Sequence, residues 1–253
     1  MNMRRSKVLE KLRAGRVAHA FKLNGSCART ADLASLFRFD CIWSDREHIA
    51  NDWSLLEKQI WAAKSNDTDV IVRVSKGSYS DYIRPLELDA AGIMVPHVTS
   101  AEEVRQVVRM TRFHPVGRRP LDGANADSRF LLVGMDEYLR QANEERFVVV
   151  QIEDPEAMDQ LDEIAAVPGI NVLFFGAGDY SHALGVPIQH PEVKKAREKV
   201  VRAAAAHGKF AGAVGIGEHY EELVAMGYLF INVGSDIRIL REGLHALSSK
   251  LGL

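Results

Sequence analysis

Short runs of apolar, often β-branched residues recur along the chain, and longer segments with helical spacing of apolar residues separate them. This alternation is typical of parallel strands joined by helices. Segment 100–113 illustrates the helical spacing, because Val104, Val107 and Val108 form one stripe. The apolar runs predict strands at residues 17–23, 41–45, 69–74, 92–96, 147–153, 171–176, 210–215 and 229–234.

Eight strands alternating with helices in 253 residues match the count of a (β/α)8 TIM barrel. An open, doubly wound sheet fits less well, because no glycine-rich dinucleotide fingerprint follows the first strand. No Pro/Gly/Ser-rich linker divides the chain, so residues 1–253 are expected to form a single domain. The pattern also predicts an N-terminal capping helix at about 3–14 and a C-terminal amphipathic helix at about 236–250.

Polar side chains stand at or just after the ends of several predicted strands, namely Lys22, Asp45, Arg73, Gln151, Glu153 and Asp179. In a TIM barrel, these C-terminal strand ends form the face that carries the active site. Glu153 and Asp179 come from neighbouring strands, so a hard divalent cation such as Mg²⁺ would offset their mutual repulsion. The alternative is that these acids cap helices or pair with arginines.

Other residues near these strand ends suggest acid/base chemistry. Asp45 and His48 are three positions apart, so the carboxylate can orient the imidazole of a candidate acid/base, or the pair is an ordinary loop hydrogen bond. Arg73 provides a fixed positive charge that can bind a substrate carboxylate or stabilise an oxyanion. The alternative is that Arg73 forms a salt bridge with Asp45 or Glu47. Residues 176–178, Gly-Ala-Gly, allow backbone N–H groups to point into the cavity and bind a carboxylate. The alternative is that these residues form a plain tight turn.

Charge and cysteine content narrow the function classes. The net charge is −2 with acids and bases interspersed, so no nucleic-acid partner is expected. The chain has only Cys27 and Cys41, and no apolar run approaches the ~20 residues of a membrane span. Segment 1–15 predicts an amphipathic helix and lacks the apolar region of a secretory signal, with a mitochondrial transit peptide as the alternative. We expect a cytoplasmic protein with reduced thiols and no membrane partner.

The remaining histidines show no His-x₃-His spacing, and the cysteines no Cys-x₂-Cys spacing, so a zinc site is not indicated. His97 follows the fourth predicted strand and is a candidate for the mouth of the site. Trp43, at a strand position, is interpreted as core packing.

Several separated motifs resemble the HpcH/HpaI aldolase family over nearly the whole chain. They are FDCIWSDREH (39–48), the Arg of VIVRV (70–74), GIMVPHVTSAEEV (92–104), FHPVGRR (113–119), VQIEDPEAM (150–158), LFFGAGD (173–179) and HPEVKKA (190–196). The resemblance implies a (β/α)8 barrel that joins or separates an aldehyde and pyruvate, or a related 2-oxo acid such as hydroxypyruvate. It also implies a divalent metal cofactor, Mg²⁺, Mn²⁺ or Co²⁺.

By this resemblance, Glu153 and Asp179 match the metal ligands, and Arg73 matches the arginine that contacts the oxo-acid oxygen. Asp45 and His48 match the acid/base dyad. Glu47 matches the acid that holds a metal-bound water, and Gln151 matches a polar residue that lines the site. Gly176, Ala177 and Gly178 match the loop whose amides face the substrate carboxylate.

The resemblance further implies a homo-oligomer built from dimers, up to a hexamer, in which the C-terminal helix is exchanged between subunits. The apolar stripe of this helix consists of Ile237, Leu240, Leu244 and Leu247. The stripe by itself does not separate exchange from closure of the same subunit's barrel.

Departures from the commoner family pattern bear on the substrate and mechanism. Lys22 stands where a bulky apolar residue is usual, Arg46 where Gly is usual, and Ala177 and Gly178 where Pro and Ala are usual. We therefore expect an acidic or polyhydroxylated aldehyde, steered by Lys22 or Arg46. Three alternatives remain: a metal-free Schiff base on Lys22, an acyl-CoA lyase of the citrate lyase β type, and a non-catalytic binder of an oxo acid.

Overall fold

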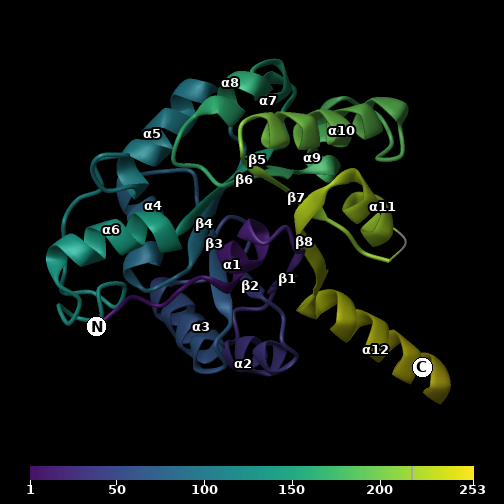
Figure 1. Ribbon diagram of the computed structural model, residues 1–253. Helices are drawn as coiled ribbons and strands as arrows, with labels where there is room; N and C mark the ends of the chain where they lie inside the picture. Colours follow the sequence, from purple (N-terminus) through teal and green to yellow (C-terminus); the bar gives the residue numbers. More distant parts are fainter. Residues whose placement is uncertain (218) are drawn as a thin grey trace.

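A computed structural model of the chain describes residues 1–217 and 219–253, and its eight strands form a closed barrel of parallel neighbours (Figure 1). The predicted (β/α)8 fold is confirmed. The strands are β1 (Ala18–Lys22), β2 (Cys41–Asp45), β3 (Asp69–Arg73), β4 (Gly92–Val95), β5 (Phe147–Ile152), β6 (Val172–Phe175), β7 (Phe210–Val214) and β8 (Tyr228–Ser235).

Helices surround this barrel (Figure 1). They are α1 (Lys7–Arg13), α2 (Ala28–Leu36), α3 (Trp53–Ser65), α4 (Tyr79–Glu87), α5 (Ala101–Thr111), α6 (Met135–Glu145), α7 (Pro155–Asp159), α8 (Leu161–Ala166), α9 (Ala177–Ala183), α10 (Pro191–Ala206), α11 (His219–Met226) and α12 (Asp236–Leu251). Element bounds differ from the predicted ranges by a few residues. One difference matters for function, because Glu153 is the first residue after β5 rather than its last.

Apolar side chains fill the barrel interior and leave one end of it for chemistry. Large residues from opposite strands, including Trp43, Phe147, Phe174 and Phe230, are buried there, and each contributes roughly 1.5–3 kcal/mol of transfer free energy. At the N-terminal end of the strands, α1 adds Val8, Leu9 and Leu12 to the same cluster. The polar residues at the opposite, C-terminal strand ends therefore stand above a closed apolar floor.

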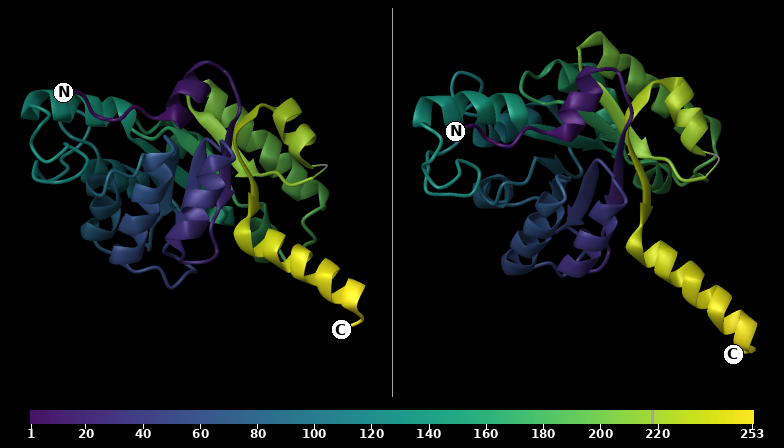
Figure 2. Two further views of the ribbon diagram at one scale, coloured as in Figure 1. Left: turned by 90° about the horizontal axis from the view of Figure 1, so that it is seen from below. Right: turned by 60° about the horizontal axis from the view of Figure 1, so that its bottom comes forward.

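The last helix, α12, extends away from the barrel (Figures 1 and 2). None of its residues is buried, and Leu240, Leu244 and Leu247 are each more than half exposed. The alternative that this helix closes its own barrel is therefore wrong. Its first residue is fixed, because the Asp236 carboxylate accepts hydrogen bonds from the backbone N–H groups of Asn24 (2.7 Å) and Gly25 (3.0 Å).

The segment between α5 and α6, residues 112–134, has no helix or strand. Buried charges hold it, because the Asp127 carboxylate accepts hydrogen bonds from Arg146 Nε at 2.6 Å and Arg119 Nη1 at 3.2 Å. The same segment exposes several large apolar side chains, namely Leu121, Phe130, Leu131 and Leu132. As for membranes, none of the described helices combines the length and apolar composition that a transmembrane span requires.

Candidate active site

A cavity of about 630 Å³ lies at the C-terminal ends of the strands, as the barrel fold predicts. Most of the predicted site residues line it, namely Lys22, Arg73, Gln151, Glu153, Gly176, Ala177, Gly178 and Asp179. The cavity therefore gathers residues from β1, β3, β5 and the start of α9 that are far apart in the sequence.

Glu153 is a buried carboxylate on the wall of this cavity. It is 1% exposed, and it accepts hydrogen bonds from Gln151 Nε2 (3.0 Å) and from the backbone N–H of His97 (2.9 Å). Burial raises the pKa of Glu153 to about 7. The N–H group and charge of His97 oppose this rise, whereas the negative charges of Asp179 and Glu47 add to it. A bound cation beside Glu153 would add to the charge of His97 and stabilise the ionised carboxylate.

The surroundings of Glu153 fit a hard divalent cation. A Cβ atom on Gly176 would overlap Glu153 Oε2 and lie 2.7 Å from Glu153 Cβ, so glycine is required to leave the carboxylate in place. Gln151 Oε1 is buried and has no hydrogen-bond partner among the described residues. Carboxylate and amide oxygens are the ligands that Mg²⁺ and similar ions prefer.

The same site provides few protein ligands. Over residues 1–217 and 219–253, no group of three or more His, Cys, Asp or Glu side chains is arranged to hold a metal ion. Glu153 and Asp179 would therefore supply only two carboxylates. This count matches Mg²⁺-type sites, in which one or two carboxylates bind the ion and it keeps several waters.

Arg73 and Asp45 form a buried ion pair at the ends of β3 and β2. Arg73 Nε donates to Asp45 Oδ1 at 3.0 Å, and its Nη2 donates to Oδ2. Arg73 Nη1 lies 3.0 Å from Glu47 Oε2, and Lys22 Nζ lies 3.0 Å from Asp45 Oδ2. Burial would raise the pKa of Asp45, but the hydrogen bond and charge of Arg73, with the charge of Lys22, lower it to about 2.

The structure does not bring Asp45 and His48 together. Within the described residues, no hydrogen bond joins the two side chains, because Arg73 and Lys22 occupy the oxygens of Asp45. The His48 side chain is 63% exposed, and its Nε2 lies 3.5 Å from Glu47 Oε2. The expectation that Asp45 orients His48 is therefore wrong for this structure, and Glu47 is the carboxylate beside the imidazole.

His97 is at the rim of the site, as its position after the fourth strand suggested. Its Nδ1 lies 3.0 Å from Asp154 Oδ2, and its Nε2 lies 3.7 Å from Glu47 Oε1. Burial lowers the pKa of His97, but the hydrogen bond to Asp154 and the charges of Glu153, Asp154 and Glu47 outweigh this and raise it. His97 thus connects Asp154, which follows β5, with Glu47, which follows β2.

The Gly-Ala-Gly sequence is not a plain turn. Gly176 precedes α9, and Ala177 and Gly178 are its first two residues. The first N–H groups of a helix have no partner within that helix. Ala177 and Gly178 line the cavity, so the start of α9 forms part of its wall.

Arg46, which was expected to steer the substrate, points elsewhere. Its guanidinium carbon lies 3.5 Å from the centre of the Trp53 ring, and its Nε donates to the Asn51 carbonyl at 3.0 Å. Arg46 does not line the cavity. The expectation for Arg46 is wrong, because the aromatic ring at the start of α3 offers its side chain a stacking partner outside the site.

Among the described residues, six polar side chains that line the cavity were missed in the sequence: Asn24, Arg197, His219, Asn232, Ser235 and Arg238. Asn232 is 4% exposed, and its Oδ1 has no hydrogen-bond partner in the described chain. A polar residue inside the apolar run 229–234 was the available signal. Arg197 and Arg238 lie on helices, where arginines resemble ordinary solvated residues, so no pattern in the sequence distinguishes them.

Trp43 both packs in the core, as interpreted, and forms part of the cavity floor. Its ring meets Phe174 edge to face, with ring centroids 5.4 Å apart. Lys22 Nζ and Arg73 Cζ lie 5.0 Å and 5.2 Å from the ring centroid. The indole therefore supports two of the cations at the site.

The chain is similar to known proteins over most of its length. The family model described as HpcH/HpaI aldolase/citrate lyase matches residues 21–242. The 2-keto-3-deoxy-L-rhamnonate aldolase of Escherichia coli (strain K12) is 32% identical over 238 residues, which cover 93% of this chain and 89% of the relative.

Two solved structures have closely similar folds. The HpcH/HpaI aldolase from Desulfitobacterium hafniense DCB-2 has a TM-score of 0.88 at 28% identity, covering 95% of this chain and 96% of that one. The citrate synthase SbnG also has a TM-score of 0.88, at 26% identity, covering 98% of this chain and 97% of that one.

Proposed function

Since this chain belongs to the HpcH/HpaI aldolase/citrate lyase family, we propose that it is a divalent-metal-dependent aldolase acting on a 2-oxo acid and an aldehyde. In the cleavage direction, the C3–C4 bond of a 4-hydroxy-2-oxo acid breaks and releases the aldehyde and pyruvate, or a related 2-oxo acid such as hydroxypyruvate. The observation that carries the proposal is the buried Glu153, whose pKa is raised to about 7 in the cavity that Asp179 also lines. Such perturbed carboxylates in a cavity are typical of functional sites.

Glu153 and Asp179 would hold the cation, with Gln151 Oε1 as a further oxygen. Mg²⁺, Mn²⁺ or Co²⁺ bound there supplies positive charge that stabilises negative charge on a substrate oxygen. Unpaired N–H groups of Ala177 and Gly178 would bind the carboxylate of the 2-oxo acid.

Arg73 and His48 would act on the reacting atoms. A guanidinium has more N–H groups than Asp45 and Glu47 occupy, so Arg73 can still donate to the 2-oxo oxygen on which negative charge develops. Losing one such donor typically costs ~10²–10³-fold in rate. His48 Nε2, beside Glu47, would take the proton from the C4 hydroxyl and return it in the synthetic direction. Asp45 would hold Arg73 and Lys22 in place.

Lys22 would contact the aldehyde half of the substrate. Arg197 and Arg238 line the same cavity as Lys22, so these three cationic side chains stand there together with the acids Glu153 and Asp179. The positive charge beyond the proposed metal site favours an aldehyde that is acidic or rich in hydroxyl groups. A Schiff base on Lys22 is disfavoured, because it would leave Glu153 and Asp179 in the cavity without a role, and Lys22 Nζ already pairs with Asp45 Oδ2 at 3.0 Å.

We also propose that the protein is a homo-oligomer in which α12 packs on another subunit. The stripe of Ile237, Leu240, Leu244 and Leu247 is at least half exposed, and segment 121–132 exposes further large apolar side chains. Contiguous exposed apolar surface of this kind typically marks an interface.

The proposed function is tested by a half-reaction that needs no aldehyde. Pyruvate methyl exchange in D₂O is followed by NMR after chelation and after addition of Mg²⁺, Mn²⁺ or Co²⁺. We expect exchange that chelation abolishes and metal restores, and no exchange in Glu153→Ala or Asp179→Ala. Exchange that survives chelation, with borohydride trapping pyruvate on Lys22, would replace the metal mechanism with a Schiff base. No exchange with pyruvate or hydroxypyruvate under any condition would favour a thioester lyase or a binding protein.

A further inference from the structure

The connection between β2 and α3, residues 46–52, carries Glu47 and His48. Glu47 contacts the cavity-lining Arg73, and His48 lies beside Glu47. The exposed His48 side chain contributes little to fixing this connection, since its only ion-pair contact among the described residues is with Glu47. Glu47 itself is held directly, because Arg73 Nη1 lies 3.0 Å from its Oε2 and the Glu47 backbone N–H donates to Asp45 Oδ1 at 3.0 Å. The contacts at the two ends of the connection determine whether the backbone keeps Glu47 and His48 within reach of these partners.

Asn51 ties the end of this connection to the strand that begins it. Its Nδ2 donates to Ser44 Oγ at 3.0 Å and to Gln59 Oε1 at 3.1 Å. Ser44 Oγ donates to the same Gln59 oxygen at 2.5 Å. Ser44 on β2 and Gln59 on α3 are fully buried, and Asn51 is 6% exposed. Hydrogen bonds in such surroundings are costly to lose, so they define one arrangement of the chain.

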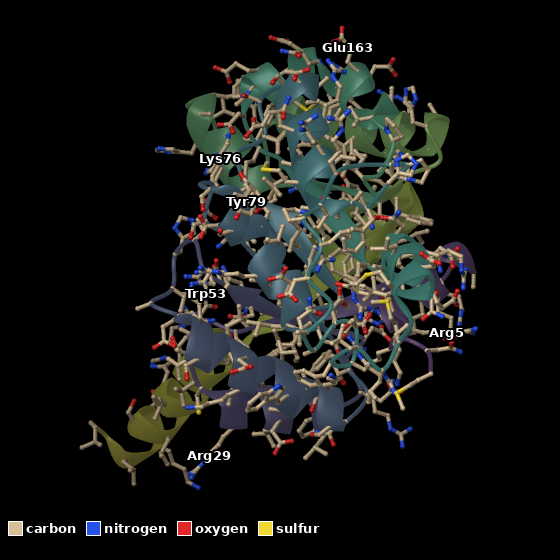
Figure 3. The ribbon with its side chains drawn as sticks, turned by 90° about the vertical axis from the view of Figure 1, so that its left-hand side faces the viewer. Arg5, Arg29, Trp53, Lys76, Tyr79 and Glu163 are labelled. Atoms are coloured by element: carbon tan, nitrogen blue, oxygen red, sulfur yellow. The ribbon has the colours of Figure 1, made fainter. Side chains whose placement is uncertain are left out.

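The main chain of Asn51 is held as well. Its carbonyl accepts from Arg46 Nε at 3.0 Å, and the Arg46 guanidinium is stacked on Trp53. The Arg46 backbone N–H donates to the Arg73 carbonyl at 2.9 Å. Figure 3 shows Trp53 at the outer surface of the molecule, away from the barrel interior. These contacts hold the connection at Arg46 and at Asn51, on either side of Glu47 and His48, and involve neither of those two side chains.

This polar cluster gains little stability for the fold. Asn51 Oδ1 and Gln59 Nε2 are buried and have no hydrogen-bond partner in the described structure. Each buried, unsatisfied group loses its hydrogen bonds to water without replacing them, and a well-packed apolar cluster would avoid that cost. The cluster therefore requires an explanation other than stability.

We propose that Asn51 is a positioning residue that sets the places of Glu47 and His48 for the proton transfer of the proposed aldolase reaction. The inference rests on the proposed function for its kinetic consequence, but its structural consequence is independent of activity. The Asn51 side chain contacts no cavity-lining residue. Its Nδ2 also donates to the Asp45 carbonyl at 3.4 Å, at the point where the connection leaves β2, so its effect passes through the backbone of the connection.

The test compares two asparagines at opposite ends of α3. Asn66, just after the helix, donates to Asp32 Oδ1 and Ser35 Oγ, both at 2.8 Å, and is distant in sequence from the connection. Asn51→Ala and Asn66→Ala each delete a hydrogen-bonded amide. Both variants are crystallised, and their aldol turnover and Mn²⁺ affinity are measured. Arg46→Met, which deletes the bond to the Asn51 carbonyl, is the second variant should Asn51→Ala not fold.

We expect Asn51→Ala to move Glu47 out of its 3.0 Å contact with Arg73 Nη1. Its kcat should fall by about 10²-fold, the effect of misplacing a catalytic group by roughly 1 Å. The Mn²⁺ affinity should stay unchanged, because Glu153 and Asp179 are untouched, and Asn66→Ala should match the wild type in all three measurements. Crystals of Asn51→Ala with Glu47 and His48 in place, or an unchanged kcat, would overturn the inference. A wild-type protein without aldolase activity would instead refute the proposed function, and the crystal structures alone would then decide the role of Asn51.

Discussion

Arg73 and Asp45 hold each other at two points inside the barrel, with Arg73 Nε 3.0 Å from Asp45 Oδ1 and Nη2 bonded to Oδ2. Both side chains are buried, so removal of one charge leaves the other without full compensation. We expect Asp45→Asn to lower the free energy of unfolding by about 3 kcal/mol, the low end of the usual range, because Glu47 still pairs with Arg73. Urea denaturation measures this, with Asp136→Asn on exposed α6 as control. A loss no larger than that of the control would contradict the prediction.

The raised pKa of Glu153 predicts how the metal-free protein responds to pH. The ordinary pKa of 4.5 rises to about 7 on folding, so the folded state binds this proton more tightly than the unfolded state does. Stability from this group is therefore complete below pH 4.5 and is lost as pH rises through about 7. Glu153→Gln stays neutral and should be more stable than the wild type at about pH 8, with the difference closing near pH 4.

Thermal unfolding in chelator at several pH values measures the difference between wild type and Glu153→Gln. Glu156→Gln, an exposed acid on α7, is the matched control and should show no such pH dependence. Added Mn²⁺ should stabilise the wild type at the higher pH and leave Glu153→Gln unaffected. An identical offset between wild type and Glu153→Gln at every pH would show that Glu153 is not destabilised by its surroundings.

The sequence predicted the barrel and most of the cavity for one physical reason. Strand interiors must be apolar, so each polar residue at a strand end, such as Lys22, Arg73 or Glu153, stands out against the pattern. The partner choices were not predictable in the same way. Asp45 is three residues from His48 in the sequence, yet it pairs with Arg73 and Lys22 from the adjacent strands, because parallel neighbours bring those cations closer than the loop does.

Cavity-lining residues on helices were the hardest to predict from the sequence. Arg197 and Arg238 line the cavity, but a helix always presents some arginines to solvent, so position alone gives no contrast. Arg46 shows the opposite kind of error, because an arginine next to site residues in the sequence was expected to face the cavity and does not line it. The Trp53 ring, seven residues later, determined its direction instead.

Lys22 is predicted to select the aldehyde by charge. Glyoxylate and glycolaldehyde differ mainly in a carboxylate, so their kcat/KM values in aldol addition compare an anionic with a neutral partner. We expect Lys22→Met to lower the value for glyoxylate by at least tenfold more than for glycolaldehyde, since an ionic hydrogen bond contributes roughly 1.5–3 kcal/mol. Lys195→Met, on the exposed side of α10, is the control. Equal losses with both aldehydes would mean that Lys22 acts only through Asp45.

The exposed stripe of α12 is predicted to hold subunits together. Leu244→Glu places a charge at a position that is 56% exposed in the isolated chain but buried in the proposed oligomer. Size-exclusion chromatography with light scattering should show the wild type as an oligomer and the variant as a smaller species. Arg241→Glu, also on α12, controls for added negative charge on the helix. A wild-type protein that runs as a monomer would refute the proposed exchange of α12.

Gly176 and Gly178 provide a matched pair that tests the cradle around Glu153. A methyl group on Gly176 would overlap the Glu153 carboxylate, whereas a Cβ on Gly178 meets no heavy atom within 4 Å. Gly176→Ala should therefore displace Glu153 and weaken Mn²⁺ binding by about 10–100-fold, the usual effect of disturbing residues that orient a metal ligand. Gly178→Ala adds the same methyl group two residues later, at the start of the same helix, and should leave Mn²⁺ affinity within a factor of about two, because no neighbour has to move. Calorimetric titration with Mn²⁺ measures both. Equal affinities for the two variants would mean that Glu153 can move without loss, and that Gly176 is not needed to place a metal ligand.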